Sequence, residues 1–297
     1  MRLKRPGVVL LASLAAAQIV TANAQAGGLA HKWDPDLKAL ITEALPGPEV
    51  ATFGVAIAHV PTGYVAYSNS RLLFESASLL KLPVLYEAYR QRSVGRLSFG
   101  EQLEITERHA EIAFGYTPVP VGDALSVDRA IELMITASDN ASAIALIDRL
   151  GNFSINRTMQ DIELASTAVL ADSVTTPRDM LTYFELLESH EAVDWDSSEE
   201  MLARLSRQRI NDRIPMLLPS GTEVAHKTGD DPGVINDAGI VYTPAGPVII
   251  VLLANDVQNG PGVRRAMAEL SLRIYEYAEE GGFGDYPPSD VSDASLP

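Results

Sequence analysis

Residues 75–84 read ESASLLKLPV and place one lysine, Lys81, in an apolar run three positions after Ser78. A cation among leucines is costly unless a function uses it. Residues three apart face the same side of a helix, so the helix expected over residues 78–91 brings the hydroxyl and the amine together. At the start of that helix, the backbone N–H of Ser78 is free to bind a developing oxyanion. The stretch therefore predicts a serine nucleophile with a lysine base.

A lysine can act as this base only if its pKa falls from about 10.4 towards 7–8, a change of about 4 kcal/mol. Burial among the leucines lowers the pKa of Lys81, and a second cation nearby lowers it further. That cation has to come from elsewhere in the chain.

Two further stretches, Ser138-Asp139-Asn140 and Lys227-Thr228-Gly229, supply matching chemistry. The first presents a hydroxyl and an amide two residues apart, although it is also typical of a helix that ends in a loop. The second follows the strand-like EVAH, although it also fits an edge-strand lysine before a turn. All three patterns in this order are expected by chance in fewer than about one chain in a hundred.

With S-x-x-K, S-D-N and K-T-G in this order, the chain resembles the class A β-lactamases and the related penicillin-recognising serine hydrolases. The match of elements runs over about residues 33–280. The resemblance implies that Ser78 is the acylated nucleophile and Lys81 its proton acceptor. It also implies that Ser138 passes a proton to the leaving nitrogen and that Asn140 binds the substrate's side-chain amide.

For the third motif, the resemblance implies that Lys227 is the second cation, which lowers the pKa of Lys81 and attracts a substrate carboxylate. Thr228 is then the hydroxyl partner of the substrate, and Gly229 lies in the same binding segment. The resemblance also implies that the backbone N–H groups of Ser78 and Asp230 form the oxyanion hole. The resemblance implies no cofactor, and the five scattered histidines suggest no metal site.

The chain departs from the family in two places. Residues 159–177, MQDIELASTAVLADSVTTP, lack the E-x-x-L-N motif whose glutamate activates the deacylating water. Glu163 is the one glutamate in that stretch and the candidate for this role, but it better fits a solvated acid at a helix end. After K-T-G there is no arginine for a substrate carboxylate, and Asp230, Asp231 and Asp237 make the region acidic. We therefore expect weaker recognition of anionic β-lactams or a different substrate.

Strand patterns lie at both ends of the chain and helical patterns fill the middle. We expect helices over residues 34–45, 78–91, 130–137 (capped by Ser126) and 262–279, and strands over 50–60, 64–67, 223–227, 238–242 and 248–254. His226 alternates with Lys227 on its strand, so it should face away from the cleft.

The fold class that follows is α/β of the α+β type, a β-lactamase/DD-peptidase-like fold. An antiparallel sheet built from both chain ends is flanked by helices and carries an inserted all-helical subdomain. We expect one domain over residues 30–280, with an α/β lobe (30–77 and 219–280), a helical lobe (78–218) and a ligand cleft between them. Residues 281–297 form a flexible tail.

The first residues have the three parts of a secretory signal over residues 1–24, with cleavage after Ala24 or Ala26. Their apolar run, residues 8–20, is too short to span a bilayer. We therefore expect a periplasmic or secreted protein without stable membrane insertion. The formal charge of −16 disfavours nucleic-acid partners, and the absence of cysteine excludes disulfides and thiolate chemistry.

The leading functional hypothesis is an exported, monomeric serine hydrolase that opens β-lactam rings through an acyl-Ser78 intermediate, with slow deacylation. One alternative is a D-alanyl-D-alanine peptidase acting on cell-wall peptide, for which a β-lactam is only an inhibitor. Others are an esterase or amidase with the same catalytic parts, and a ligand-binding protein without catalysis. Turnover and the lifetime of the acyl-enzyme discriminate among them.

Overall fold

The computed structural model describes residues 31–112, 119–169 and 172–284. The predicted signal over residues 1–24 and residues 285–297 of the predicted tail over 281–297 lie outside these described residues. In the described part, no helix has the length and apolar character needed to cross a membrane.

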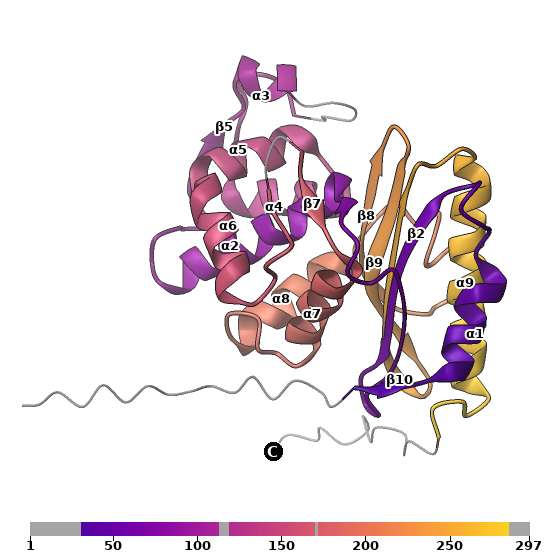
Figure 1. Cartoon of the computed structure of the whole chain (residues 1–297). Helices are drawn as coiled ribbons and strands as arrows, with labels where there is room; N and C mark the ends of the chain where they lie inside the picture. The colour runs from indigo at the N-terminus through magenta and orange to yellow at the C-terminus, as the bar shows by residue number, and fades with distance from the viewer. Residues whose placement is uncertain (1–30, 113–118, 170–171, 285–297) are drawn as a thin grey trace, which may run out of the picture. The chain divides into compact units, whose positions relative to one another are not determined.

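A six-stranded sheet joins the two ends of the described chain, in the order β1-β3-β2-β10-β9-β8 (Figure 1). Its pairs are antiparallel except for the parallel pair of β1 with β3. The strand β10 reads GPVIIVLLAN and is buried along most of its length, as expected for a central strand with both faces covered. The strands are β1 (Lys32–Trp33), β2 (Thr52–His59), β3 (Tyr64–Ser68), β8 (Val224–Asp231), β9 (Val234–Thr243) and β10 (Gly246–Asn255).

Two helices from opposite ends of the chain, α1 (Pro35–Ala44) and α9 (Gly260–Glu279), cover one face of this sheet (Figure 1). The carboxylate of Asp34 caps α1 by accepting hydrogen bonds from the N–H groups of Asp36 and Leu37. Leu37 is fully buried against the sheet in the same hydrophobic cluster as Ile250. The predicted antiparallel sheet from both chain ends is therefore confirmed.

The middle of the chain forms the helical lobe on the other face of the sheet (Figure 1). Its helices are η1 (Ala77–Leu80), α2 (Lys81–Ser93), α3 (Glu107–Ile112), α4 (Val127–Thr136), α5 (Asn140–Leu150), α6 (Asn152–Asp161), α7 (Pro177–Glu188) and α8 (Trp195–Leu205). The lobe also holds a two-stranded ribbon, β5 (Gln102–Glu104) with β6 (Ala124–Ser126), so it is not entirely helical. Strands of three residues are too short to show a period-two pattern, which is why the sequence did not indicate them.

A second short pair, β4 (Phe74–Glu75) with β7 (Val174–Thr175), leads into the segment that carries Ser78. Strand β4 therefore connects the sheet lobe to the middle of the chain immediately before the nucleophile segment. Like the ribbon, it is too short for a sequence pattern to reveal.

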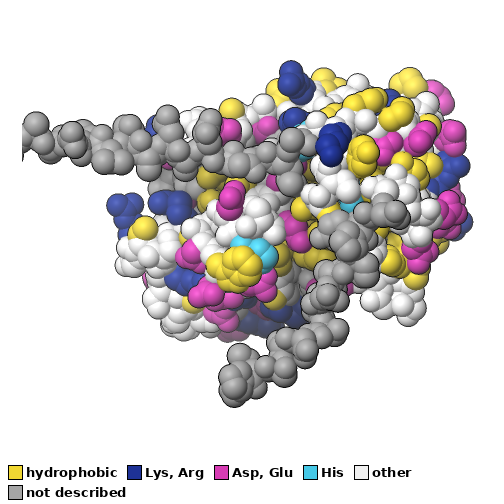
Figure 2. Space-filling view, turned by 90° about the horizontal axis from the view of Figure 1, so that it is seen from below, with side chains coloured by type: hydrophobic (Ala, Val, Ile, Leu, Met, Phe, Trp, Pro, Cys, Tyr) yellow, Lys and Arg dark blue, Asp and Glu magenta, His cyan; other side chains and the backbone are white. Residues whose placement is uncertain are grey.

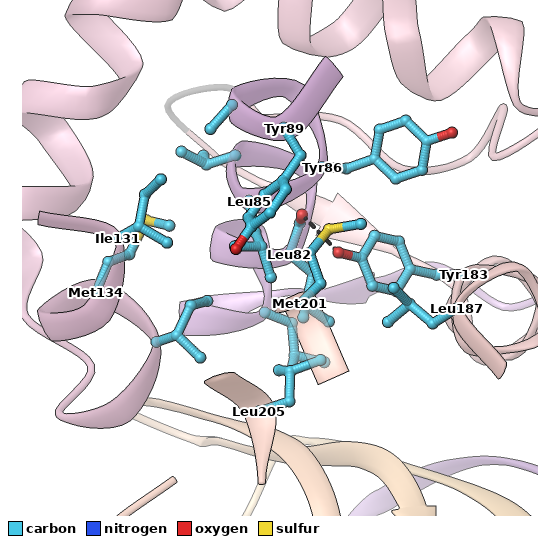
Figure 3. Close-up of a cluster of buried hydrophobic side chains, with 14 of the residues drawn as sticks. Leu82, Leu85, Tyr86, Tyr89, Ile131, Met134, Tyr183, Leu187, Met201 and Leu205 are labelled. Carbon is cyan, nitrogen blue, oxygen red and sulfur yellow. Dashed lines mark hydrogen bonds between the residues drawn. The ribbon is translucent and has the colours of Figure 1, made fainter. Parts of the chain in front are cut away.

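Helix α2 runs through the hydrophobic core of the helical lobe (Figure 3). Its Leu82 and Tyr89 are fully buried, and the Tyr183 hydroxyl of α7 donates a 3.0 Å hydrogen bond to the carbonyl of Leu82. Pro83 lies in the first turn of α2, where a backbone N–H needs no helical acceptor, so it leaves the helix intact. These contacts fix the start of α2, where Lys81 is the first residue.

Acidic and basic side chains are interspersed on the face of the molecule seen in Figure 2. The excess of acidic residues in the composition therefore gives this face a mixed charge rather than a field of one sign.

Candidate active site

Ser78 lies on the short 3-10 helix η1, one turn before α2 begins at Lys81. The sequence predicted a single helix from residue 78, and the structure divides it at this point. Ala77, directly before Ser78, has φ 45°, in the left-handed region that non-glycine residues rarely adopt. This conformation turns the chain from β4 into the helix and leaves Ser78 partly exposed.

The Lys81 amine is the centre of the site. Its Nζ lies 3.0 Å from Ser78 Oγ, 2.9 Å from Ser138 Oγ and 2.6 Å from Asn140 Oδ1. It also donates a 2.6 Å hydrogen bond to the carbonyl of Ser138. The structure therefore brings together the first two sequence motifs, although Ser138 and Asn140 are 57 and 59 residues from Lys81 in the chain.

Burial lowers the pKa of Lys81 from 10.5 to about 7, while the negative charges of Asp139 and Asp231 oppose the change. Burial also lowers the pKa of Lys227 well below its ordinary value, and the charge of Lys81 lowers it further. The sequence expectation attributed the lowered pKa of Lys81 to burial and to the charge of Lys227 together. The structure assigns the leading part to burial, because Lys81 is only 2% exposed.

Ser138 lies in the turn between α4 and α5 and links the two lysines. Its Oγ is 2.9 Å from Lys81 Nζ and 3.1 Å from Lys227 Nζ. Its φ of 57° is in the left-handed region, and the following Asp139 caps α5 by accepting a hydrogen bond from the Ser142 N–H. The hydroxyl and amine groups thus form a continuous chain from Ser78 through Lys81 and Ser138 to Lys227.

The K-T-G motif lies on β8, the outer strand of the sheet, next to the Ser78 segment. Lys227 and Thr228 are almost completely buried, and Lys227 donates to the carbonyl of Thr228. A Cβ at Gly229 would lie 2.9 Å from the carbonyl oxygen of Ser76 and 3.2 Å from the backbone nitrogen of Ser78. Glycine is therefore required for β8 to approach the nucleophile this closely. The proposed oxyanion hole at Ser78 and Asp230 stays a prediction.

Asn236 on β9 is a positioning residue that the sequence reasoning missed. Its Nδ2 donates hydrogen bonds to the carbonyls of Glu75 (2.9 Å) and Ser76 (3.1 Å), and its Oδ1 accepts one from the Ala254 N–H. It is fully buried and holds the backbone that precedes Ser78. The available signal was a polar residue in the otherwise apolar strand segment VINDAGIV.

His226 is buried and contacts Asp237 Oδ1 at 2.8 Å and Asn211 Oδ1 at 2.9 Å. Both ring nitrogens of His226 are therefore paired with Asp237 and Asn211, not with Lys81 or Lys227. This arrangement agrees with the expectation that it faces away from the cleft.

Two arginines that the sequence did not place in the site reach the end of β8. Arg213 Nη2 donates to both carboxylate oxygens of Asp230 at 2.5 Å, and Arg264 at the start of α9 donates to the same carboxylate. Arg213 is 1% exposed and also donates to the carbonyl of Asn236. The segment after K-T-G has no arginine of its own, but these two arginine side chains reach it from other parts of the chain.

Glu163 follows α6 as an exposed residue with φ 66°. The hydrogen-bond partners of the Lys81 amine are two hydroxyls, a carbonyl and an amide oxygen, all of them uncharged. No contact in the described residues connects Glu163 to this group, and its role in water activation stays a prediction.

Two cavities flank the turn between β8 and β9. One, of about 420 Å³, is lined by Asn140, Asp230 and Arg264, and the other, of about 310 Å³, by Ala77 and Leu80. Both therefore open beside the residues that surround Ser78, as expected for a substrate cleft between the lobes.

This fold and this site together define a serine hydrolase whose nucleophile is activated by a buried lysine. The chain belongs to the beta-lactamase enzyme family, whose model matches residues 35–278. It is a serine β-lactamase-like hydrolase.

Beta-lactamase VEB-1 from Pseudomonas aeruginosa is 23% identical over 260 residues, 78% of this chain and 84% of the relative. A solved PBP-A variant, in its acyl-enzyme complex with penicillin G, is 25% identical with a TM-score of 0.78, covering 84% of this chain and 98% of its own. A beta-lactamase from Sphaerobacter thermophilus shares the fold, with a TM-score of 0.74 and 21% identity over 82% of this chain and 97% of its own.

Proposed function

We propose that this protein opens β-lactam rings by acylation of Ser78 and that it releases the acyl group slowly. The observation that carries the proposal is the 3.0 Å contact between Ser78 Oγ and the Lys81 amine, whose pKa is about 7. A base with this pKa is unprotonated in half of the molecules at neutral pH and can accept the serine proton.

The acylation step follows from the chain of contacts. Neutral Lys81 accepts the proton of Ser78 Oγ while this oxygen attacks the lactam carbonyl and forms a tetrahedral oxyanion. When the C–N bond breaks, the Ser138 hydroxyl donates its proton to the ring nitrogen and takes one from Lys81. The ring is then open, Ser78 carries an ester, and Lys81 is neutral again.

Slow deacylation follows from the uncharged hydrogen-bond partners of the Lys81 amine; the carboxylates of Asp139 and Asp231 act on its pKa only as nearby charges. In the described residues, the hydrogen-bond partners of Ser78 and Lys81 include no carboxylate that could activate water. Water activation then falls to Lys81 itself. A mutant of the similar PBP-A has been solved as an acyl-enzyme complex with penicillin G, which supports acylation of Ser78 by a penicillin.

The same observation favours a second candidate, a D-alanyl-D-alanine peptidase that β-lactams only inhibit. In such an enzyme the acyl group comes from cell-wall peptide, and a persistent penicillin ester is the expected result. An esterase or amidase and a binding protein without catalysis remain further alternatives, which the acyl-enzyme lifetime separates from these two.

We also propose that the protein is exported to the periplasm or medium and acts there as a monomer. The support is the N-terminal sequence with its basic start, apolar run and small residues before Ala24 and Ala26. Intact mass of the protein recovered from periplasm or medium would show the mature start. Retention of the uncleaved chain in the cytoplasm would contradict export.

The test is covalent labelling with a fluorescent penicillin, followed by intact mass over time. Ser78→Ala should abolish labelling, whereas Ser93→Ala, at the exposed end of α2, should label like the wild type. Loss of the adduct within minutes, with nitrocefin turnover, supports a β-lactamase. An adduct that persists for hours without turnover supports the peptidase. Equal labelling of the Ser78→Ala variant would refute both.

A further inference from the structure

We propose that Asp230 is a built-in counter-ion that occupies the anion-binding position of two arginines and makes the enzyme select substrates without a carboxylate beside the scissile amide. This inference rests on the proposed acylation of Ser78. It names a specificity-determining residue and the class of substrate that follows from it.

Asp230 lies at the substrate end of β8, one residue after the glycine that contacts the Ser78 backbone. Its side chain is 40% exposed and lines the 420 Å³ cavity together with Asn140 and Arg264. The carboxylate is therefore in the cleft, where it pairs with Arg264, which lines the same cavity, and with Arg213, which is buried.

Both arginines direct their guanidinium groups at this one carboxylate. Arg213 binds it through Nη2, and Arg264 binds it through its own Nη2. Arg213 is 1% exposed, so a substrate carboxylate could reach it only by replacing Asp230. Paired guanidinium groups are a strong site for a carboxylate, and here the protein supplies that carboxylate itself.

The remaining charges keep this position from attracting an anion. Asp212 lies 3.4 Å from Arg213 Nε and 3.1 Å from Arg264 Nε, so two acids balance the two arginines. Asp231 lines the same cavity, and burial together with the neighbouring Asp230 raises its pKa. The amines of Lys81 and Lys227 are also nearby, but both are buried, and burial lowers the pKa of each.

The arrangement therefore carries no net positive charge for a substrate carboxylate. A neutral ester or amide group avoids both the repulsion from Asp230 and the loss of its ion pairs. Replacement of Asp230 by a neutral residue would leave one uncompensated positive charge and convert the position into an anion site.

The experiment compares acylation of the full-length protein by penicillin G and by its neutral methyl ester, measured by competition with a fluorescent penicillin. For the wild type, we expect the ester to acylate at least as fast as the free acid. For Asp230→Asn, we expect the ratio of acylation by the acid to acylation by the ester to rise about tenfold or more. Asp230→Ser, without the amide, should shift the ratio the same way.

Asp148→Asn is the matched control. It removes the same charge from a side chain of similar exposure, 42%, that pairs with Arg108 on the helical lobe. Its acid-to-ester ratio should equal that of the wild type.

A purely structural role for Asp230 would lower acylation by both substrates together and leave their ratio unchanged. Such a result in both Asp230 variants would overturn the inference while the proposed function stands. If neither substrate acylates the wild type, the proposed function fails and this inference fails with it.

Discussion

Replacement of Lys81 by methionine should stabilise the fold while it abolishes acylation, because the site holds this lysine at a cost. A lysine whose pKa falls from 10.5 to about 7 on folding is destabilised by about 4 kcal/mol at pH 7, at about 1.4 kcal/mol for each factor of ten in proton affinity. Methionine fills a similar volume in the same buried position without a charge.

The sign of the pH dependence follows from the proton count. Between pH 7 and 10.5 the unfolded chain binds more protons at Lys81 than the folded protein, so wild-type stability rises with pH in this window. By pH 10 the remaining penalty is about 1 kcal/mol. The advantage of Lys81→Met should therefore shrink by about 3 kcal/mol from pH 7 to pH 10.

Hydrogen bonds lost with the amine, such as those to Ser138 and Asn140, lower the absolute stability of the variant. The loss of these hydrogen bonds changes the pH dependence of the stability difference much less than the number of bound protons does. Removal of Lys81 also frees Lys227 from a neighbouring positive charge, which adds to the stabilisation of the variant.

The assay is urea unfolding of both proteins at pH 7, 8, 9 and 10, with Lys38→Met on α1 as control for the loss of a lysine outside the site. A stability difference between wild type and Lys81→Met that stays constant across this range would refute the reasoning. It would mean that Lys81 keeps its proton in the folded protein.

Two further outcomes are expected. The acylation rate constant of the wild type should rise with pH through about 7 and then level off, because the neutral form of Lys81 is the base; a stopped-flow profile that is flat from pH 5 to 9 would contradict this. Gly229→Ala should slow acylation by about 10- to 100-fold, because its Cβ would lie 2.9 Å from the Ser76 carbonyl oxygen and displace the Ser78 segment. Gly100→Ala, where a Cβ meets only a serine hydroxyl at 3.8 Å, should acylate like the wild type, and equal rates for both variants would rule out the close approach at Gly229.

The sequence alone determined the chemistry that depends on residue type and local spacing. A hydroxyl and an amine three residues apart indicated the nucleophile and its base, and S-D-N and K-T-G indicated their partners. Apolar runs such as that of β10 predicted the strands of the sheet, because the apolar pattern of a buried strand can be recognised from consecutive residues. The cap of α4 at Ser126 was likewise local, and the structure has it.

Only the tertiary structure decided how charge is arranged around that chemistry. Arg213 and Arg264 are 17 and 34 residues from Asp230 in the chain, so no local pattern indicated that they converge on it. The pKa of Lys81 also depends on how completely the fold removes water from its amine, and burial is a property of the packed molecule. Electrostatic interactions act through space, and for that reason the catalytic residues could be inferred from the sequence whereas their charge balance could not.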